Sequence, residues 1–169
     1  MVTEVTIETL KNHIRNIPDF PKPGIQFKDI TPILKDPELF GFAVDTLVES
    51  YASKGITKIV CIESRGFILG GAMAARLNAG FIPVRKPGKL PAPTATKHYQ
   101  LEYGTDSVEV HRDAIGEEDV LLLHDDLLAT GGTAAATISL LNMFAPRKIY
   151  MSFLVELDFL QGRSRLAGY

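Results

Sequence analysis

The stretch from Leu123 to Thr133 constrains the fold more than any other part of this chain. Val120 to Leu123 has the length and composition of a strand buried on both faces, and Ala134 to Phe144 has a helical pattern. A small-residue turn therefore joins a buried strand to the beginning of a helix. Two adjacent carboxylates, Asp125 and Asp126, stand between the strand and the turn. This order predicts a ligand site at the carboxyl end of a parallel strand in an α/β protein.

The turn itself contains the groups that bind a phosphate. Its glycines let backbone N–H groups close around phosphate oxygens, the helix N-terminus adds a partial positive charge, and Thr130 and Thr133 can donate hydroxyl hydrogen bonds. We expect a branched side chain at Gly132 to crowd this site. The two carboxylates would repel a phosphate, so we expect them to face ribose hydroxyls or a bridging divalent cation.

Other readings of the same stretch fit less well. A P-loop needs a lysine where Gly132 stands, and a dinucleotide-binding fingerprint places its acid after the glycines rather than before them. A receiver-type metal site would place the acid pair after the first strand. An ordinary strand that ends in a glycine turn remains the simplest alternative.

Composition limits the size and the partners of the protein. With 169 residues, 46% of them hydrophobic, the chain can bury one sizeable core but hardly two. Its net charge of −2 gives no overall attraction for nucleic acid. No stretch approaches the roughly 18 apolar residues of a membrane span, and the N-terminus has no basic and apolar signal. Cys61 is the only cysteine. We therefore expect one cytoplasmic domain that binds neither nucleic acid nor membranes.

The rest of the pattern alternates between strands and helices. Ile7, Leu10, Ile14 and Ile17 repeat at helical spacing, and a proline cluster after them predicts an extended loop. Further along, short β-branched runs alternate with helical patterns, which predicts a mostly parallel, twisted sheet flanked by helices. The runs read as strands are 58–62, 81–84, 120–123 and 149–155, and those read as helices are 36–51, 67–77 and 134–144.

An excursion interrupts this alternation between Arg85 and Ala114. Prolines and glycines fill its first half, and two short alternating runs, Tyr99 to Tyr103 and Val108 to His111, follow. The excursion predicts a loop and hairpin inserted between core strands, as in many lids and binding loops. In an open α/β sheet the ligand lies beyond the carboxyl ends of the strands, so Glu63, Arg85 and Asp125 would meet at one edge.

Several segments together resemble the type I phosphoribosyltransferase family over nearly the whole chain. The stretch 123–133 resembles the family's motif for 5-phosphoribosyl-1-pyrophosphate (PRPP), and Glu63 to Phe67 resembles its pyrophosphate loop. Asp19 to Pro32, Pro83 to Pro91 and Tyr99 to Gly104 resemble further family segments, the first of them the base-side loop of the adenine-specific members. The resemblance implies one domain, 1–169, with an N-terminal hood segment at 1–34 and a mobile loop and hairpin at 86–114.

The resemblance also implies the reaction. Adenine and PRPP would give AMP and pyrophosphate, with Mg²⁺ carried by the pyrophosphate rather than by direct protein ligands, in a homodimer. Arg65, Lys86 and Lys89 are then the candidate cations at the pyrophosphate, and Arg65 lies beside an implied cis peptide at Glu63-Ser64. Asp125 and Asp126 would accept hydrogen bonds from the ribose 2′- and 3′-hydroxyls. The residues assigned to the 5′-phosphate are Ala129, Thr130, Gly131, Gly132 and Thr133.

The base and the proton carrier are assigned by the same resemblance. It implies an adenine-side wall of Ile25, Phe27 and Lys28, with Leu127 and Leu157 as further apolar lining, although the apolar members fit a core role almost as well. Family members that act on 6-oxopurines typically carry an aspartate where this chain has Ala129. Glu102 matches the family's general acid/base, whereas a lone glutamate in a strand usually faces water.

Three interpretations stay open at this point. The leading one is an enzyme that transfers phosphoribose to adenine. The others are an enzyme for hypoxanthine, guanine or orotate, and a PRPP- or nucleotide-sensing protein that has lost the chemistry. Ala129 argues against an enzyme for another base. Glu102, Arg65 and the two lysines argue against a sensing protein without catalytic activity. His124 stands where the family commonly has Val or Ile, and we assign it no chemical role.

Overall fold

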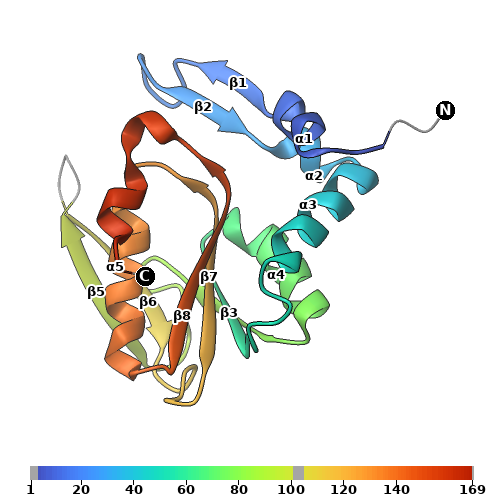
Figure 1. Ribbon diagram of the computed structural model, residues 1–169. Helices are drawn as coiled ribbons and strands as arrows, with labels where there is room; N and C mark the ends of the chain where they lie inside the picture. The colour runs from blue at the N-terminus through green and yellow to red at the C-terminus, as the bar shows by residue number, and fades with distance from the viewer. Residues whose placement is uncertain (1–3, 101–104, 169) are drawn as a thin grey trace. The chain divides into compact units, whose positions relative to one another are not determined.

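The computed structural model describes residues 4–100 and 105–168, and the chain divides into two compact units, Met1–Thr46 and Leu47–Tyr169. The larger unit is built on a four-stranded parallel sheet in the order β4-β3-β7-β8 (Figure 1). Each strand pairs in the same direction as its neighbour, with Cys61 opposite His124 and Asp125 opposite Phe153. The strands of the sheet are β3 (Lys58–Ile62), β4 (Gly80–Val84), β7 (Val120–Leu128) and β8 (Lys148–Glu156).

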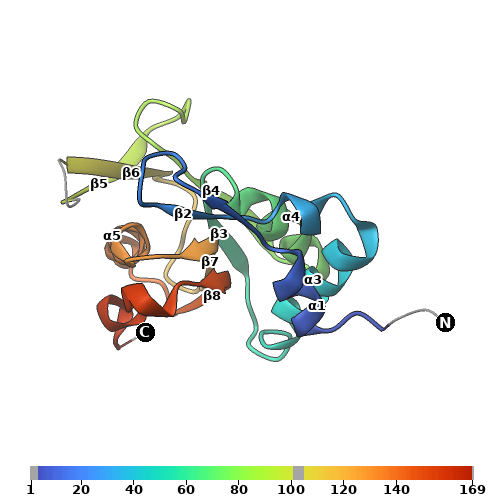
Figure 2. The same ribbon diagram turned by 90° about the horizontal axis from the view of Figure 1, so that it is seen from above.

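Helices follow the strands, as the alternating pattern predicts. The helix α4 (Gly66–Leu77) packs on β3, β4 and β7, and at Gly70 an added Cβ would collide with the Cys61 Sγ. The helix α5 (Gly132–Leu141) follows β7 and lies beside the hairpin of β5 and β6 (Figure 2). The described part of this unit also contains the short 3₁₀ helices η1 (Asn142–Phe144), η2 (Asp158–Leu160) and η3 (Gly162–Leu166).

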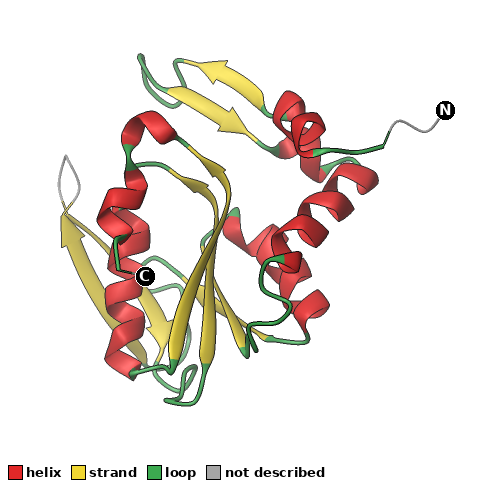
Figure 3. Ribbon diagram, in the orientation of Figure 1, coloured by secondary structure: helices red, strands yellow, loops and turns green. Residues whose placement is uncertain are grey.

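The excursion after β4 contains an antiparallel hairpin, as the sequence predicts (Figure 3). Its strands are β5 (Thr94–Gln100) and β6 (Thr105–His111), so β5 begins before the predicted Tyr99 and β6 before the predicted Val108, because cross-strand pairing continues beyond the alternating runs. An isolated bridge joins Arg85 to Glu109. Ala95, Val108 and Val110 are buried in one core cluster with the sheet and α5. The hairpin is therefore packed on its apolar side, and burial of these side chains ties it to the sheet.

The smaller unit contains a helix, a hairpin and two further helices. The helix α1 (Ile7–His13) is capped by Thr6, whose side chain accepts a hydrogen bond from the Thr9 N–H. The remaining elements are β1 (Arg15–Pro18), β2 (Gln26–Asp29), α2 (Thr31–Leu34) and α3 (Pro37–Glu49), the last of which contains the boundary with the larger unit.

Two predicted elements differ from the structure. The helical spacing of Ile14 and Ile17 is misleading, because α1 ends at His13 and Ile17 pairs with Phe27 in a hairpin, where the sequence predicts a helix and an extended loop. Four apolar residues at helical spacing do not distinguish one long helix from a helix followed by a strand. The second difference is that β7 continues to Leu128, because the strand pairs with β8 past both aspartates.

The fold class is confirmed: a parallel sheet flanked by helices, with antiparallel hairpins added. Within the described residues, no helix is both long enough and apolar enough to span a membrane.

Candidate active site

The phosphate loop, which we define as Ala129 to Thr133, connects the end of β7 to the first turn of α5. Gly131 has a φ of +77°, and a Cβ added there would lie 2.5 Å from the backbone oxygen of Gly162. Only glycine adopts this conformation without strain and fits this contact. At Gly132, where the sequence predicts that a branched side chain would crowd a bound phosphate, the protein itself leaves room, since an added Cβ would lie 3.5 Å from the flexible end of Arg165. The steric constraint of the loop is therefore at Gly131.

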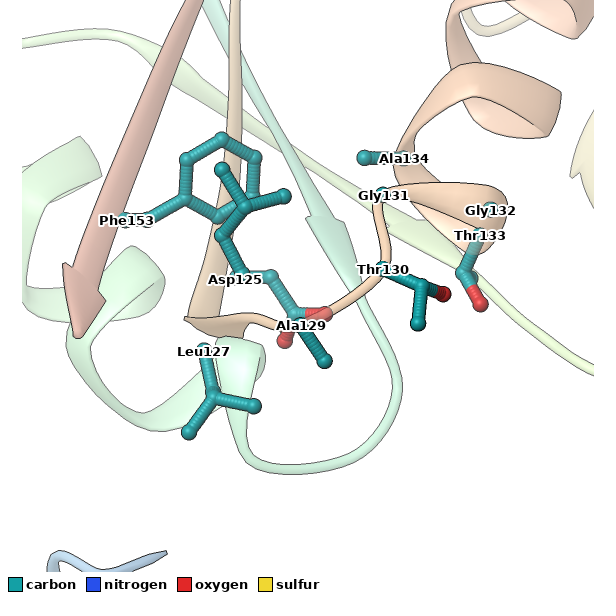
Figure 4. A pocket seen from close by; sticks show the side chains of 10 residues that line it. Asp125, Leu127, Ala129, Thr130, Gly131, Gly132, Thr133, Ala134 and Phe153 are labelled. Carbon is teal, nitrogen blue, oxygen red and sulfur yellow. The ribbon is translucent and has the colours of Figure 1, made fainter. Parts of the chain in front are cut away.

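A small cavity of about 90 Å³ opens on this loop. Figure 4 shows the side chains of Thr130 and Thr133 extending from the loop, with the Asp125 side chain on the other side of Ala129. The N–H groups in the first turn of a helix point toward its N-terminus, and in α5 this end joins the phosphate loop. The residues lining the cavity are Asp125, Leu127, Leu128, Ala129, Thr130, Gly131, Gly132, Thr133, Ala134 and Phe153.

The acid pair takes two different environments. Asp125 lines the cavity, and its Oδ1 accepts a hydrogen bond of 2.9 Å from the Asp126 N–H. The Asp126 side chain is only 5% exposed, and its Oδ2 lies 2.8 Å from the Nε of Arg65. Arg65 immediately precedes α4, after a cis peptide bond between Glu63 and Ser64. The expected cis peptide is thus confirmed, and Arg65 and Asp126 meet at the carboxyl edge of the sheet.

Burial raises the pKa of both carboxyl groups. The neighbouring charge of Asp126 raises the pKa of Asp125 further, while Arg65 acts in the opposite direction on both. Asp125 therefore sits beside the cavity as an acceptor whose negative charge is poorly compensated by the protein. Hydroxyl groups of a sugar, or a divalent cation, are the kinds of partner that stabilise such a carboxylate.

Two of the predicted cations, Lys86 and Lys89, belong to a group that we call the Glu63 cluster, whereas the third, Arg65, pairs with Asp126. The Glu63 cluster consists of Glu63, Arg85, Lys86 and Lys89. The Glu63 Oε2 accepts from the Arg85 Nε at 2.9 Å, and its Oε1 accepts from the Lys86 N–H at 2.8 Å and the Lys89 Nζ at 3.0 Å. The Glu63 side chain is 7% exposed. Burial alone would raise its pKa, but these three donors outweigh burial and lower it, so Glu63 is an ionised anchor.

Lys86 joins the Glu63 cluster to the hairpin. Its Nζ forms an ion pair with Asp106 of β6 and lies 3.5 Å from the Tyr99 hydroxyl. Burial would lower the pKa of Lys86, but the hydrogen bond and the charge of Asp106 outweigh burial and raise it. Tyr99 also lies 3.2 Å from the Thr133 Oγ1, so a chain of polar contacts runs from Lys86 to the phosphate loop.

The predicted adenine-side residues belong to both units of the chain. In the smaller unit, Phe27 of β2 packs edge-to-face on Phe20 at 5.1 Å between ring centroids, and Ile25 is 44% exposed. The Nζ of Lys28 donates to Asn16 of β1. In the larger unit, Leu127 lines the cavity, and the Leu157 N–H donates to the Leu128 carbonyl at 2.9 Å. Glu102, the predicted acid/base, lies outside the described residues.

His124 is fully buried below the acid pair, and its Nδ1 lies 3.4 Å from the Ser152 hydroxyl. Burial lowers its pKa to about 4, although a hydrogen bond with the Ser152 backbone acts in the opposite direction. A neutral imidazole in the sheet interior matches the structural role that the sequence suggests. Among residues 4–100 and 105–168, no group of three or more His, Cys, Asp or Glu side chains is placed to hold a metal ion.

Sequence reasoning did not identify three residues of this site. The sequence predicts that Glu63 lies at the sheet edge, in the segment that resembles the pyrophosphate loop, but it predicts no role for the Glu63 side chain, and it predicts none for Tyr99 or Asp106. Glu63 lies at the end of a strand next to basic residues, which is a usable signal. Tyr99 and Asp106 form a cross-strand pair of β5 and β6, and this pairing depends on the hairpin register.

The comparisons with known proteins agree with this geometry. The phosphoribosyl transferase domain family matches residues 33–163, and the chain belongs to that family. Within it, the chain is 59% identical over 156 residues to an adenine phosphoribosyltransferase of Phocaeicola vulgatus, covering 92% of this chain and 90% of the relative.

Solved structures point the same way. The adenine phosphoribosyltransferase of Rhodothermus marinus superposes with a TM-score of 0.92 at 57% identity, over 96% of this chain and 92% of that one. The Saccharomyces cerevisiae enzyme, solved with an imino-altritol bisphosphate and adenine, gives a TM-score of 0.87 at 39% identity, over 94% of this chain and 93% of that one.

Proposed function

We propose that the protein converts adenine and PRPP to AMP and pyrophosphate by displacement at the anomeric carbon of the sugar. The single observation that carries the proposal is the phosphate loop with Asp125 beside it: a glycine-constrained turn at a helix N-terminus, next to a poorly compensated carboxylate. The loop suits the 5′-phosphate and the carboxylate suits the ribose hydroxyls. The similarity to enzymes named for adenine, one of them solved with adenine, supports the choice of base.

The leaving pyrophosphate carries several negative charges and needs cations. In this proposal the cations are Arg65, Lys86 and Lys89. Arg65 follows the carboxyl end of β3 in the chain, and the two lysines follow the carboxyl end of β4. Mg²⁺ bound to pyrophosphate would supply further charge neutralisation. The donor set fits such a complex, because the ligands that Mg²⁺ prefers are oxygens and Asp125 presents carboxylate oxygens at the cavity.

We assign to Glu102 the transfer of the proton that adenine loses during the reaction. When adenine N9 attacks the anomeric carbon, positive charge develops on the purine ring and a proton must leave. A carboxylate at N7 accepts that proton in the forward direction and returns it in reverse. Ala129 offers no carboxylate at the phosphate loop, so Glu102 is the acid/base candidate in this chain.

We also propose a cytoplasmic homodimer. The edge strand β4 and the helix α4 expose apolar side chains, with Phe81 at 40% and Ile68 at 45% exposure, and Phe67 packs edge-to-face on Phe81. An apolar patch beside a sheet edge suits a self-complementary interface. Substrates that carry several phosphate charges do not cross membranes unaided, which favours the cytoplasm.

The test is an assay of pyrophosphate release with PRPP, Mg²⁺ and each of adenine, hypoxanthine, guanine and orotate. We expect rapid turnover with adenine alone, because a polar base pocket rejects analogues that leave its donors unpaired by up to about 10⁴-fold. Activity should disappear in excess chelator. Equal turnover of hypoxanthine would disprove the choice of adenine, and PRPP binding without turnover of any base would favour a sensing protein.

A further inference from the structure

Tyr99 lies where the hairpin meets the phosphate loop. Its hydroxyl donates to the Asp106 Oδ2 at 3.1 Å and lies 3.2 Å from the Thr133 Oγ1. Lys86 donates to the same Asp106 carboxylate and lies 3.5 Å from the Tyr99 hydroxyl. The Tyr99 ring packs against the core cluster, which keeps the hydroxyl in place. Side chains of β5, β6, α5 and the segment after β4 therefore share one network of hydrogen bonds.

The number of protons in this network limits what it can do. A phenol has one proton, so Tyr99 donates either to Asp106 or to Thr133 and not to both. While Tyr99 donates to Asp106, the Thr133 hydroxyl must supply the proton in its own contact with Tyr99. Asp106 has two other donors, the Lys86 ammonium and the Ser107 N–H at 2.8 Å.

A phosphate on the loop changes this arrangement. Thr133 then donates to the phosphate, so its contact with Tyr99 persists only if Tyr99 turns its proton toward Thr133. Asp106 loses that donor and depends more strongly on Lys86. A pyrophosphate that draws Lys86 away would leave Asp106 with the Ser107 N–H alone, and a half-buried carboxylate that lacks donors is unfavourable.

We propose that Tyr99 is a positioning residue that couples the phosphate loop to Lys86, so that a phosphate held by Thr133 and the departure of Lys86 from Asp106 oppose each other. The proposal rests on the proposed function, which places the 5′-phosphate on the loop and pyrophosphate at Lys86. It adds an energetic link between those two subsites through a residue that touches neither ligand.

The test measures pyrophosphate binding by calorimetry, at constant Mg²⁺, with and without saturating ribose 5-phosphate. Ribose 5-phosphate occupies the phosphate loop and has no leaving group, so no reaction occurs. In the unaltered protein we expect ribose 5-phosphate to weaken pyrophosphate binding. About threefold to tenfold of this weakening, the contribution of one net hydrogen bond, should depend on Tyr99. Direct repulsion between the two anions adds a further part that no substitution at Tyr99 removes.

Two variants separate the coupling from a merely structural role. Tyr99→Phe keeps the ring but never donates to Asp106, so pyrophosphate should bind weakly even without ribose 5-phosphate, and only the direct repulsion should weaken it further. Thr133→Val leaves Tyr99 free to donate to Asp106, so pyrophosphate should bind as tightly as to the unaltered protein, and ribose 5-phosphate should weaken it by the repulsion alone. Each variant should lose the same threefold to tenfold of coupling, but only Tyr99→Phe should lower the affinity for pyrophosphate alone.

The matched control is Tyr150→Phe, which removes a phenol hydroxyl from β8, and it should keep the full coupling. Coupling in Tyr99→Phe equal to that of the unaltered protein would overturn this proposal and leave the proposed function intact. If the unaltered protein bound no ribose 5-phosphate, the assignment of the phosphate loop would be wrong, and both proposals would fail.

Discussion

The phosphate loop and the Glu63 cluster handle negative charge in different ways. The phosphate loop uses backbone geometry: a glycine at φ +77°, a helix N-terminus and two hydroxyl groups, all within five consecutive residues. The Glu63 cluster uses side-chain charges that come from the end of β3 and from the segment after β4. Its lysines and Arg85 are held by carboxylates before any ligand arrives.

This difference concerns preorganisation. The loop needs little rearrangement to bind a phosphate, because its N–H groups are fixed by the backbone. Lys86 must exchange the Asp106 carboxylate for a ligand, so part of its attraction for pyrophosphate is offset by the lost ion pair, whereas Glu63 holds Lys89 in position. A rigid phosphate site beside an exchangeable cation suits an enzyme that must hold the nucleotide and release the pyrophosphate.

The largest effect is expected for the transfer of the adenine proton, a step in which neither the phosphate loop nor the Glu63 cluster takes part. Glu102→Gln keeps the size and hydrogen bonding of the side chain but cannot exchange the proton at adenine N7. The kcat should fall by roughly 10²- to 10⁴-fold, while AMP affinity changes far less. Steady-state kinetics and AMP calorimetry on the same preparation check both. A near-normal kcat would refute the assignment, and lost AMP binding in a folded variant would make Glu102 a positioning residue.

The second prediction concerns the rigidity of the phosphate loop. Gly131→Ala forces a left-handed backbone on alanine and pushes its Cβ against the Gly162 carbonyl. We expect AMP affinity to fall by about 10- to 100-fold, corresponding to a strain of about 1–3 kcal/mol. The measurement is AMP binding by calorimetry, with circular dichroism to show that the variant folds.

Gly132→Ala is the matched control for this loop, because an added Cβ there makes only ordinary contacts, with the end of Arg165 at 3.5 Å and with the Thr130 Oγ1 at 3.8 Å. Its AMP affinity should stay within about threefold of the unaltered protein. If the two alanine variants lost affinity equally, the geometry of Gly131 would not explain phosphate binding.

The third prediction addresses the Glu63 cluster. Glu63→Gln removes the charge that holds Arg85 and Lys89, so the cations lose their fixed positions. The KM for PRPP should rise by roughly tenfold with a smaller change in kcat, as expected for charge-assisted hydrogen bonds of about 1.5–3 kcal/mol that are partly replaced by solvent. Glu156→Gln is the control, since it breaks the exposed ion pair with Arg163. A KM that falls instead would mean that Glu63 competes with the ligand for the lysines.

The same contrast explains what could be predicted from the sequence. The strand, acid pair and glycine turn around Asp125 are contiguous, so the order of residues alone predicts the loop. The ion pair between Arg65 and Asp126 joins the connection between β3 and α4 to the strand β7, and Tyr99 meets Thr133 only through tertiary packing. Such contacts are decided by register and packing, which one sequence does not specify. For the same reason, the helical spacing of Ile14 and Ile17 failed where a hairpin forms.

The smallest effect is expected at His124. This residue lies in β7, the strand that leads to the phosphate loop, and we assign it no contact with a ligand of the phosphate loop or of the Glu63 cluster. Burial lowers its folded-state pKa to about 4, against an ordinary value near 6.5. Between these values the unfolded chain binds a proton that the folded protein does not. Stability from this residue is therefore complete above about pH 6.5 and is lost as the pH falls toward 4, by up to about 3 kcal/mol.

His124→Gln should flatten this part of the pH profile. Urea unfolding at intervals between pH 4 and 7 gives the slope of the unfolding free energy against pH. This slope reports how many more protons the unfolded chain binds, and that number should be smaller by up to one in the variant. The raised pKa of Asp125 works in the opposite sense, since it removes stability as the pH rises, but it is present in both proteins and cancels in the difference. An unchanged slope in His124→Gln would mean that the buried imidazole gains a proton without unfolding, and that β7 supports the loop less rigidly than its burial indicates.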